Sequence, residues 1–208
     1  MSLLQSIIIG ISIAAIPGPI FFELVRRTLT KGFWSGALLA VGEFLGNFTL
    51  LLLIFFGVSN FLTFTISKLI LYIVGASILI WLGIDALRLK KKDIEESYHK
   101  KIIKNNSIRV GFGISISSPI VIALWISLSG SYLAQFNSQY LAFLNIFTIA
   151  FGFIIFFITL AAIIHYTRHK IPSKYVIILS KIFGVILILC GASFIWKFIN
   201  LIISSSAP

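Results

Sequence analysis

The sequence predicts an all-α integral membrane protein with six spanning helices. Of its 208 residues, 59% are hydrophobic and only 11% are charged, whereas soluble domains are roughly half apolar and about a quarter charged. A run of about 18 or more apolar residues is long enough to cross the hydrocarbon layer as a helix. The six runs of this kind cover residues 4–25, 34–56, 68–87, 110–134, 140–165 and 175–201.

Basic residues are distributed unequally between the two sides of the membrane. Fifteen of the 17 lysines and arginines lie in or next to the connections after the first, third and fifth spans, which leaves Lys68 and Lys197 on the other side. Because cytoplasmic connections carry the excess of basic residues, both termini are expected outside. The net charge of +11 does not indicate a nucleic-acid partner, since no soluble domain is expected to present a basic face. The first span is too long for a signal peptide, so we expect it to be retained.

The sequence shows no pattern typical of catalytic residues or of metal ligands. Cys190 is the only cysteine, so neither a disulfide nor cysteine-pair chemistry is expected within the chain. No spacing typical of metal ligands and no Ser/His/Asp set stands out in the sequence. We therefore expect no metal site, no cofactor and no enzyme activity.

A long polar loop, residues 88–109, divides the spans into two halves of three, residues 1–87 and 110–208. GISI at 10–13 recurs at 113–116, and GAS at 75–77 recurs at 191–193. Since each half has an odd number of spans, related halves would insert in opposite orientations, as in many secondary transporters. We predict a single transmembrane domain, 1–208, built from two inverted three-helix repeats. The loop is expected to be a solvated connector that contacts lipid headgroups.

Two of the predicted spans contain a helix break. In the first span, Pro17, Gly18 and Pro19 remove backbone hydrogen bonds, and such groups are tolerated in lipid only where protein or a water-filled cavity satisfies them. In the fourth span, Ser118 and Pro119 allow two interpretations. One is a kinked helix whose serines satisfy the freed carbonyls. The other is a second broken segment whose free N–H groups face the first break and receive a carboxylate. We predict that all five residues contribute to a substrate site.

Glu43 is an acid near the middle of the second predicted span. With a rise of about 1.5 Å per residue it lies deep in a hydrocarbon layer about 30 Å thick, where an unpaired carboxylate costs several kcal/mol. Asn47 lies one turn further on the same face. Glu43 could therefore carry a coupling proton or hold an ammonium group, with Asn47 orienting it. The alternative is a protonated Glu43 that only joins helices by a hydrogen bond.

Four glycines near Glu43 form two pairs of small residues four positions apart, Gly32 with Gly36 and Gly42 with Gly46. Such pairs let the backbones of membrane helices approach closely. We predict that they serve helix packing, and exposed pairs of this kind would also suit a homodimer.

Charged residues near the cytoplasmic ends of the spans are spaced for ion pairs. Glu23 has Arg26 and Arg27 three and four positions later, and Asp85 has Arg88 three positions later. This spacing favours ion pairs on a helix surface. Because Glu23 follows the first helix break closely, a gating role for its ion pair stays open.

A set of motifs occurs in order along nearly the whole chain. The motifs are Pro17-Gly18-Pro19, Arg26-Arg27, Gly32, Gly36, Gly42 and Gly46-Asn47 in the first half, GASILIWLGI at 75–84, KIFG at 181–184 and Gly191-Ala192. This set resembles the LysE/RhtB family of amino-acid exporters. The resemblance implies a six-helix exporter of the inner membrane, driven by proton exchange. The chain differs in having Asn47 where that family has an aspartate, and Ser118-Pro119-Ile120 where it has Asn-Pro-Lys.

These observations predict a secondary transporter that exports a small zwitterionic metabolite by alternating access. Its partners would be that small molecule and the surrounding lipid. Two alternatives stay open. One is a membrane assembly protein in which the glycines serve interaction, and the other is a cation exporter, although one buried carboxylate is a thin site for a metal.

Overall fold

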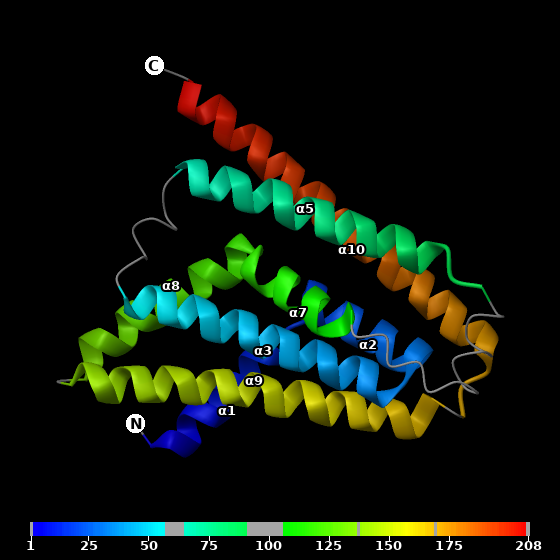
Figure 1. Cartoon of the computed structure of the whole chain (residues 1–208), viewed down its shortest axis with the longest axis horizontal. Coiled ribbons are helices and arrows are strands. Elements are labelled where there is room, and N and C mark those ends of the chain that lie inside the picture. Colours follow the sequence, from blue (N-terminus) through cyan, green and yellow to red (C-terminus); the bar gives the residue numbers. More distant parts are fainter. Residues whose placement is uncertain (1, 57–64, 91–105, 137, 169, 207–208) are drawn as a thin grey trace.

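The computed structural model describes residues 2–56, 65–90, 106–136, 138–168 and 170–206, so most of the predicted basic loop lies outside the described residues. Within the described ranges every regular element is an α-helix, which confirms the all-α prediction. The helices, shown in Figure 1, are α1 (Leu3–Ala14), α2 (Pro19–Lys31), α3 (Phe33–Phe55), α5 (Thr65–Leu87), α7 (Asn106–Ile116), α8 (Pro119–Gln135), α9 (Gln139–Arg168) and α10 (Ser173–Ser206).

Four helices, α3, α5, α9 and α10, are long and apolar enough to cross a membrane by themselves. The others form two bent pairs, with an angle of 78° between α1 and α2 and of 64° between α7 and α8. The number of spans is six when each bent pair forms one span. Both bends fall at the predicted breaks, because α2 and α8 begin with Pro19 and Pro119, and proline fits the first turn of a helix but not its interior. The fold is therefore that of a multi-span membrane protein.

The contacts between helices stay the same when each helix of the first half is replaced by the corresponding helix of the second half, and the reverse. α5 and α10 lie side by side and form the most extensive helix contact, while α3 contacts both α7 and α9, and α9 contacts α1. If α7 takes the place of α1, and α9 that of α3, the contact of α1 with α9 becomes the contact of α7 with α3. Both termini lie at one end of the molecule, and the ends of α2, α5 and α9 lie at the other (Figure 1). This second end is called the basic end below.

Close contacts at two glycines define the register of this exchange. A Cβ atom on Gly42 in α3 would collide with the carbonyl group of Ile108 in α7. A Cβ atom on Gly152 in α9 would collide in the same way with the carbonyl group of Ile7 in α1. Ile108 therefore occupies the position of Ile7, and Gly152 occupies that of Gly42.

Hydrogen bonds between the same helices follow this register. Ser6 Oγ donates to Asn145 Oδ1 at 2.7 Å between α1 and α9, and the hydroxyl groups of Ser107 and Ser35 are 3.0 Å apart between α7 and α3. SIIIG at 6–10 thus corresponds to SIRVG at 107–111. This register differs by two residues from the one suggested by the recurring GISI, because contacts between helices determine it rather than runs of identical residues. The exchange supports two related halves, and their inverted insertion stays a prediction.

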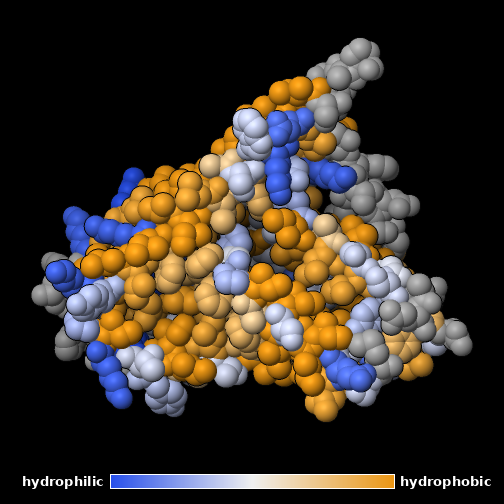
Figure 2. All heavy atoms as spheres, turned by 180° about the vertical axis from the view of Figure 1, so that it is seen from behind, coloured by the Kyte–Doolittle hydropathy of each residue, from blue (hydrophilic) through white to orange (hydrophobic). Residues whose placement is uncertain are grey.

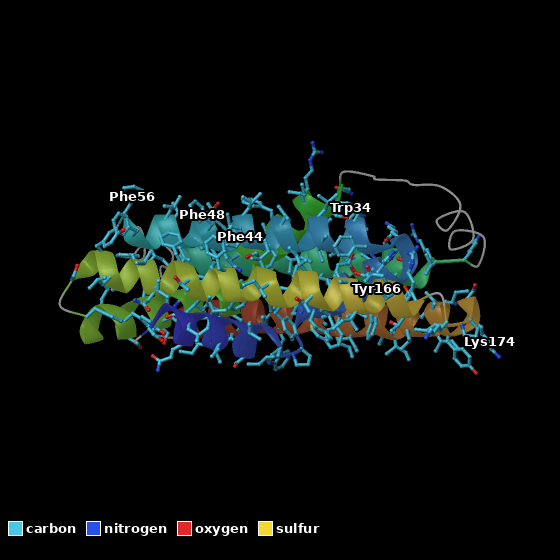
Figure 3. All side chains as sticks on the ribbon, turned by 90° about the horizontal axis from the view of Figure 1, so that it is seen from below. Trp34, Phe44, Phe48, Phe56, Tyr166 and Lys174 are labelled. Atoms are coloured by element: carbon cyan, nitrogen blue, oxygen red, sulfur yellow. The ribbon has the colours of Figure 1, made fainter. Side chains whose placement is uncertain are left out.

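The outer surface of the helices is largely hydrophobic, as Figure 2 shows for one face. Figure 3 places Trp34 and Tyr166 toward the end of the molecule that carries Lys174, and Phe56 toward the opposite end. All three aromatic side chains are exposed. Aromatic residues are enriched at both membrane–water interfaces, so their placement fits a molecule whose long axis crosses the bilayer.

We expect Gly152→Ala to lower the stability of the protein by about 1–3 kcal/mol, the usual effect of overpacking. The added Cβ would collide with the backbone of α1. Gly130 in α8 is the matched control, because nothing lies within 4 Å of the place its Cβ would take. Gly130→Ala should be neutral or stabilising by up to about 1 kcal/mol, since alanine favours a helix. Melting temperatures in one detergent measure both effects, and equal values would contradict the close contact of α1 with α9.

Candidate functional site

The first helix break leaves the N-terminus of α2 without a side-chain cap. Gly18 is extended, with φ −138° and ψ −178°, and Pro19 begins the helix. The first helical hydrogen bond runs from Phe22 N to Gly18 O at 3.1 Å, so the amide groups before Phe22 have no partner within the helix. Free N–H groups at the positive end of a helix dipole favour an anion.

The second break repeats this geometry between α7 and α8. Ser118 is extended, with φ −88° and ψ 109°, and Pro119 begins α8 without a side-chain cap. Ile122 N donates to Ser118 O at 3.1 Å. Ser117 Oγ donates to the carbonyl group of Gly113 at 2.5 Å, a bond by which serine bends a helix. With a bend of 64°, α7 and α8 are two helices separated by a break rather than one mildly kinked helix.

The structure does not join the two breaks directly. Pro17 is exposed, whereas Ser118 is buried. Among the described residues, no hydrogen bond links residues 17–19 to Ser118 or Pro119. A common site formed by both breaks therefore stays a prediction.

Asn47 is the centre of a buried polar cluster on α3. Its side-chain nitrogen donates to Glu43 Oε1 across one turn of the helix. Its side-chain oxygen accepts two hydrogen bonds, from Ser115 Oγ in α7 at 2.7 Å and from Trp125 Nε1 in α8 at 3.0 Å. All four side chains are buried. One carboxamide group therefore joins an acid to both sides of the second helix break, and these four residues are called the Asn47 cluster.

Two members of this cluster are not among the predicted site residues. Trp125 lies in an apolar run, where tryptophan counts as one more hydrophobic residue, and Ser115 is one of several serines before Pro119. A signal for Trp125 was nevertheless present. The N–H group of a buried tryptophan needs an acceptor, and Asn47 is a polar side chain in another predicted span.

Glu43 retains one carboxyl oxygen, Oε2, without a hydrogen-bond partner. The side chain is buried, and Asn47 supplies a single donor to its other oxygen. An ionised carboxylate inside a membrane needs a cation or further donors. The arrangement therefore suits either a proton on Glu43 or a cationic group of a ligand at Oε2.

A second buried cluster lies in α2 at the basic end. Glu23 accepts hydrogen bonds from Arg26 Nε and Nη2, each at 2.8 Å, and from Arg27 Nε at 2.5 Å. The three side chains are buried, and Arg27 Nη1 also donates to Ser107 Oγ in α7 at 3.0 Å. Glu23 lies in the second turn of α2 rather than the first. The gating role of these pairs stays a prediction.

Asp85 pairs with Arg26 rather than with Arg88, the partner that its spacing on α5 predicts. The Nη1 and Nη2 atoms of Arg26 are each 3.1 Å from Asp85 Oδ2. This contact fastens α2 to α5, although the Asp85 side chain is 49% exposed, which weakens the pair. Glu23, Arg26, Arg27 and Asp85 are called the ion cluster below. Two acids and two arginines leave it without net charge.

The four predicted packing glycines have different surroundings. Gly42 and Gly46 face α7, and a Cβ on Gly46 would lie 2.7 Å from Ser115 Cβ. Gly36 faces α2 and α9. Gly32 has φ +89° and forms the turn between α2 and α3, a conformation that glycine adopts readily. All four contact helices of their own chain, so they give no support to a homodimer.

Metal-binding residue types do not gather in the described part of the chain, where no group of three or more His, Cys, Asp or Glu could hold an ion. Cys190 in α10 is a free, half-buried thiol.

Broken helices beside a buried acid are characteristic of one class of membrane protein. Secondary transporters place their sites at discontinuous helices near the middle of the bilayer. This chain has two sharply bent helix pairs, and Asn47 connects Glu43 to one of them. A family model described as "LysE type translocator" matches residues 11–197. The chain belongs to this family of translocators. Membership agrees with the resemblance in the motifs and with a transporter rather than an enzyme.

Two curated relatives share about a third of the matched residues. The chain is 30% identical over 138 residues to "Putative amino acid efflux protein YcgF" of Bacillus subtilis (strain 168), with 66% of each chain covered. It is 31% identical over 137 residues to "Chemotactic transduction protein ChpE" of Pseudomonas aeruginosa, with 63% of this chain and 64% of the relative covered. The matches span slightly less than two thirds of each relative. No solved structure matches the chain.

We expect Glu23→Gln to destabilise the protein by about 3–5 kcal/mol, because two buried arginines would lose their shared counter-ion. The matched control is Asp85→Asn, which removes a half-exposed partner from Arg26 alone and should cost less than about 1 kcal/mol. Thermal melting of both purified variants in one detergent measures the difference. If Glu23→Gln melted at the same temperature as Asp85→Asn, the buried pairs would contribute no more to stability than the half-exposed one.

Proposed function

We propose that the chain exports an amino acid, or a related small zwitterionic metabolite, across the cytoplasmic membrane by alternating access. The observation that carries the proposal is the Asn47 cluster, which joins a buried acid to both sides of a helix break. Family membership supports transport. The name of the Bacillus relative supports an amino acid as the substrate. The exchange of helix contacts supports two halves that alternate.

The two charges of a zwitterion have complementary groups in this proposal. The uncapped N–H groups in the first turns that follow the two breaks, those of Ile20 and Phe21 in α2 and of Ile120 and Val121 in α8, favour a carboxylate. Glu43 Oε2, which has no partner among the described residues, would accept a hydrogen bond from an ammonium group. Asn47 fixes the rotamer of Glu43 and so determines the direction in which the free oxygen points.

Glu43 is also the proposed carrier of the coupling proton. A proton and an ammonium group would compete for the same oxygen, because only one of them can neutralise the carboxylate. Protonation from the outside would therefore displace the substrate there, and loss of the proton to the cytoplasm would prepare the site for the next substrate. This competition gives exchange of one proton for one substrate without a second acid.

The basic end of the molecule is proposed to face the cytoplasm, with both termini outside, because basic connections are retained on the cytoplasmic side. The ion cluster is the proposed inner gate. It joins α2 to α5 and α7, and breaking the half-exposed pair of Arg26 with Asp85 would free α2 on that side.

Efflux from proteoliposomes tests this proposal. Vesicles would be loaded with a mixture of radiolabelled amino acids, and efflux would be followed after the external pH is lowered. Glu43→Gln keeps the shape of the side chain but cannot ionise, and we expect proton-driven efflux to fall about tenfold or more, as for the loss of one charge-assisted hydrogen bond. Thr49→Val is the control on the same helix, because the Thr49 hydroxyl donates to the carbonyl group of Leu45, one turn earlier in α3.

Three outcomes of the efflux experiment would count against parts of the proposal. Full efflux by Glu43→Gln would remove Glu43 from the mechanism. Retention of every amino acid by wild-type vesicles would exclude amino-acid export and favour an assembly protein. Release of labelled manganese, but of no amino acid, would identify a cation exporter.

A further inference from the structure

A pocket of about 740 Å³ opens between α5, α8 and α10 at the end of the molecule opposite to the basic end. Its walls are largely apolar, and its polar lining includes Lys68 and Tyr72 of α5 and Lys197 and Asn200 of α10. Figure 2 shows hydrophilic residues near the C-terminal end of the chain, above a hollow in the hydrophobic face. Pro119, at the start of α8, also lines the pocket, so the pocket reaches the second helix break.

In the exchange of the two halves, α2, which carries the ion cluster, corresponds to α8, which lines this pocket. Pro19 begins α2 as Pro119 begins α8, and counting from these prolines brings Arg26 to the position of Ile126. Ile126 lines the pocket. The face of α8 that lines the pocket is therefore the counterpart of the face of α2 that carries the ion cluster.

α5, which carries Asp85 of the ion cluster, corresponds in the same way to α10. GAS at 75–77 of α5 recurs at 191–193 of α10, and in this register Asp85 corresponds to Leu201, which also lines the pocket. At the basic end, Arg26 reaches Asp85 and closes the space between its two helices. At the opposite end, two apolar side chains take these places and the space stays open. Among the described residues, the space between α2 and α5 is thus closed by Arg26 and Asp85, whereas the equivalent space beside α8 and α10 is open.

The described residues that line this pocket supply no counter-ion for its two positive charges. Lys68 and Lys197 are the two basic residues outside the basic connections, a side of the membrane on which basic residues are not favoured. Both line the same pocket, and none of its lining residues is acidic. Two ammonium groups that share a space repel each other, and each brings three hydrogen-bond donors. An anionic group between them would remove the repulsion.

We propose that this pocket is the outward vestibule of the transport route and that Lys68 and Lys197 bind the carboxylate of the departing metabolite. The assignment rests on the proposed export function. The metabolite leaves Glu43 when a proton arrives, passes Pro119 and meets the two lysines with its carboxylate. Both lysines are exposed, so water screens the attraction and the metabolite is released rather than retained.

Anion binding in detergent tests this site without any transport. The melting temperature of the purified protein would be measured with sodium acetate and with inorganic phosphate, each against sodium chloride at equal ionic strength. Acetate and phosphate should raise it for the wild type and for the double variant Lys68→Arg with Lys197→Arg. They should not raise it for the double variant Lys68→Gln with Lys197→Gln. Lys181→Gln, an exposed lysine of α10 near the basic end, is the control and should behave as the wild type. An equal rise in the double glutamine variant would overturn the proposal.

The same variants in vesicles separate a metabolite from a lipid headgroup. In phosphatidylcholine vesicles, external unlabelled amino acid should inhibit efflux, and the half-inhibiting concentration should rise about tenfold in the double glutamine variant, as for one charge-assisted hydrogen bond. If the lysines mattered only when phosphatidylglycerol was present, and acetate and phosphate did not bind in detergent, the pocket would be a lipid site and the assignment would be wrong. Lysine-dependent binding of acetate by a protein that exports no amino acid would preserve the anion site while the proposed function failed.

Discussion

The side chain of Asn47 satisfies the strongest constraint on this structure, which is that polar groups inside a membrane must find partners within the protein. It donates to Glu43 and accepts from Ser115 and Trp125, so three helices meet at one carboxamide group. α7 and α8 are separate helices with a sharp bend between them, and Asn47 holds both at fixed positions on α3. The break at Pro119 can therefore persist in lipid without a continuous backbone ladder. If Trp125 moved away from Asn47, its buried N–H group would lose its hydrogen-bond acceptor.

The two ends of the molecule have the same helix packing but different electrostatics. At the basic end, α2 carries Glu23 and two arginines, and Arg26 extends to Asp85 on α5. At the other end, α8 has the uncharged residues Ala123, Ile126 and Ser127 in the equivalent positions, and the lysines come instead from α5 and α10. A neutral cluster can close a passage because it satisfies itself, whereas two unbalanced cations favour an anionic ligand. This difference agrees with the separate tasks proposed for the two ends, an inner gate and an outward vestibule.

Local features of the sequence predicted the local parts of the structure. Two prolines marked both helix breaks, because proline acts through its own backbone, and the spacing of Glu43 and Asn47 predicted that both share a helix face. Contacts between distant segments could not be read in this way. The spacing on α5 predicted a pair of Asp85 with Arg88, but Arg26 of the neighbouring α2 is its partner. The four identical residues of the recurring GISI suggested one register between the halves, whereas the backbone contacts at Gly42 and Gly152 show another. The role of Trp125 was not predicted, because its hydrogen bond depends on which helix packs against α8.

The polar cluster has no counterpart in the other half of the chain. In the register set by Gly42 and Gly152, Glu43 corresponds to Phe153 and Asn47 to Phe157, and both aromatic side chains are buried. The helix scaffold is thus repeated while its polar interior is present once. Each buried polar group in a membrane costs free energy unless it is paired, so a second cluster would burden the fold without adding a passage. In the proposed mechanism, the one acid of the Asn47 cluster is also the one place where proton and substrate compete, so the repeated scaffold would hold one transport route rather than two.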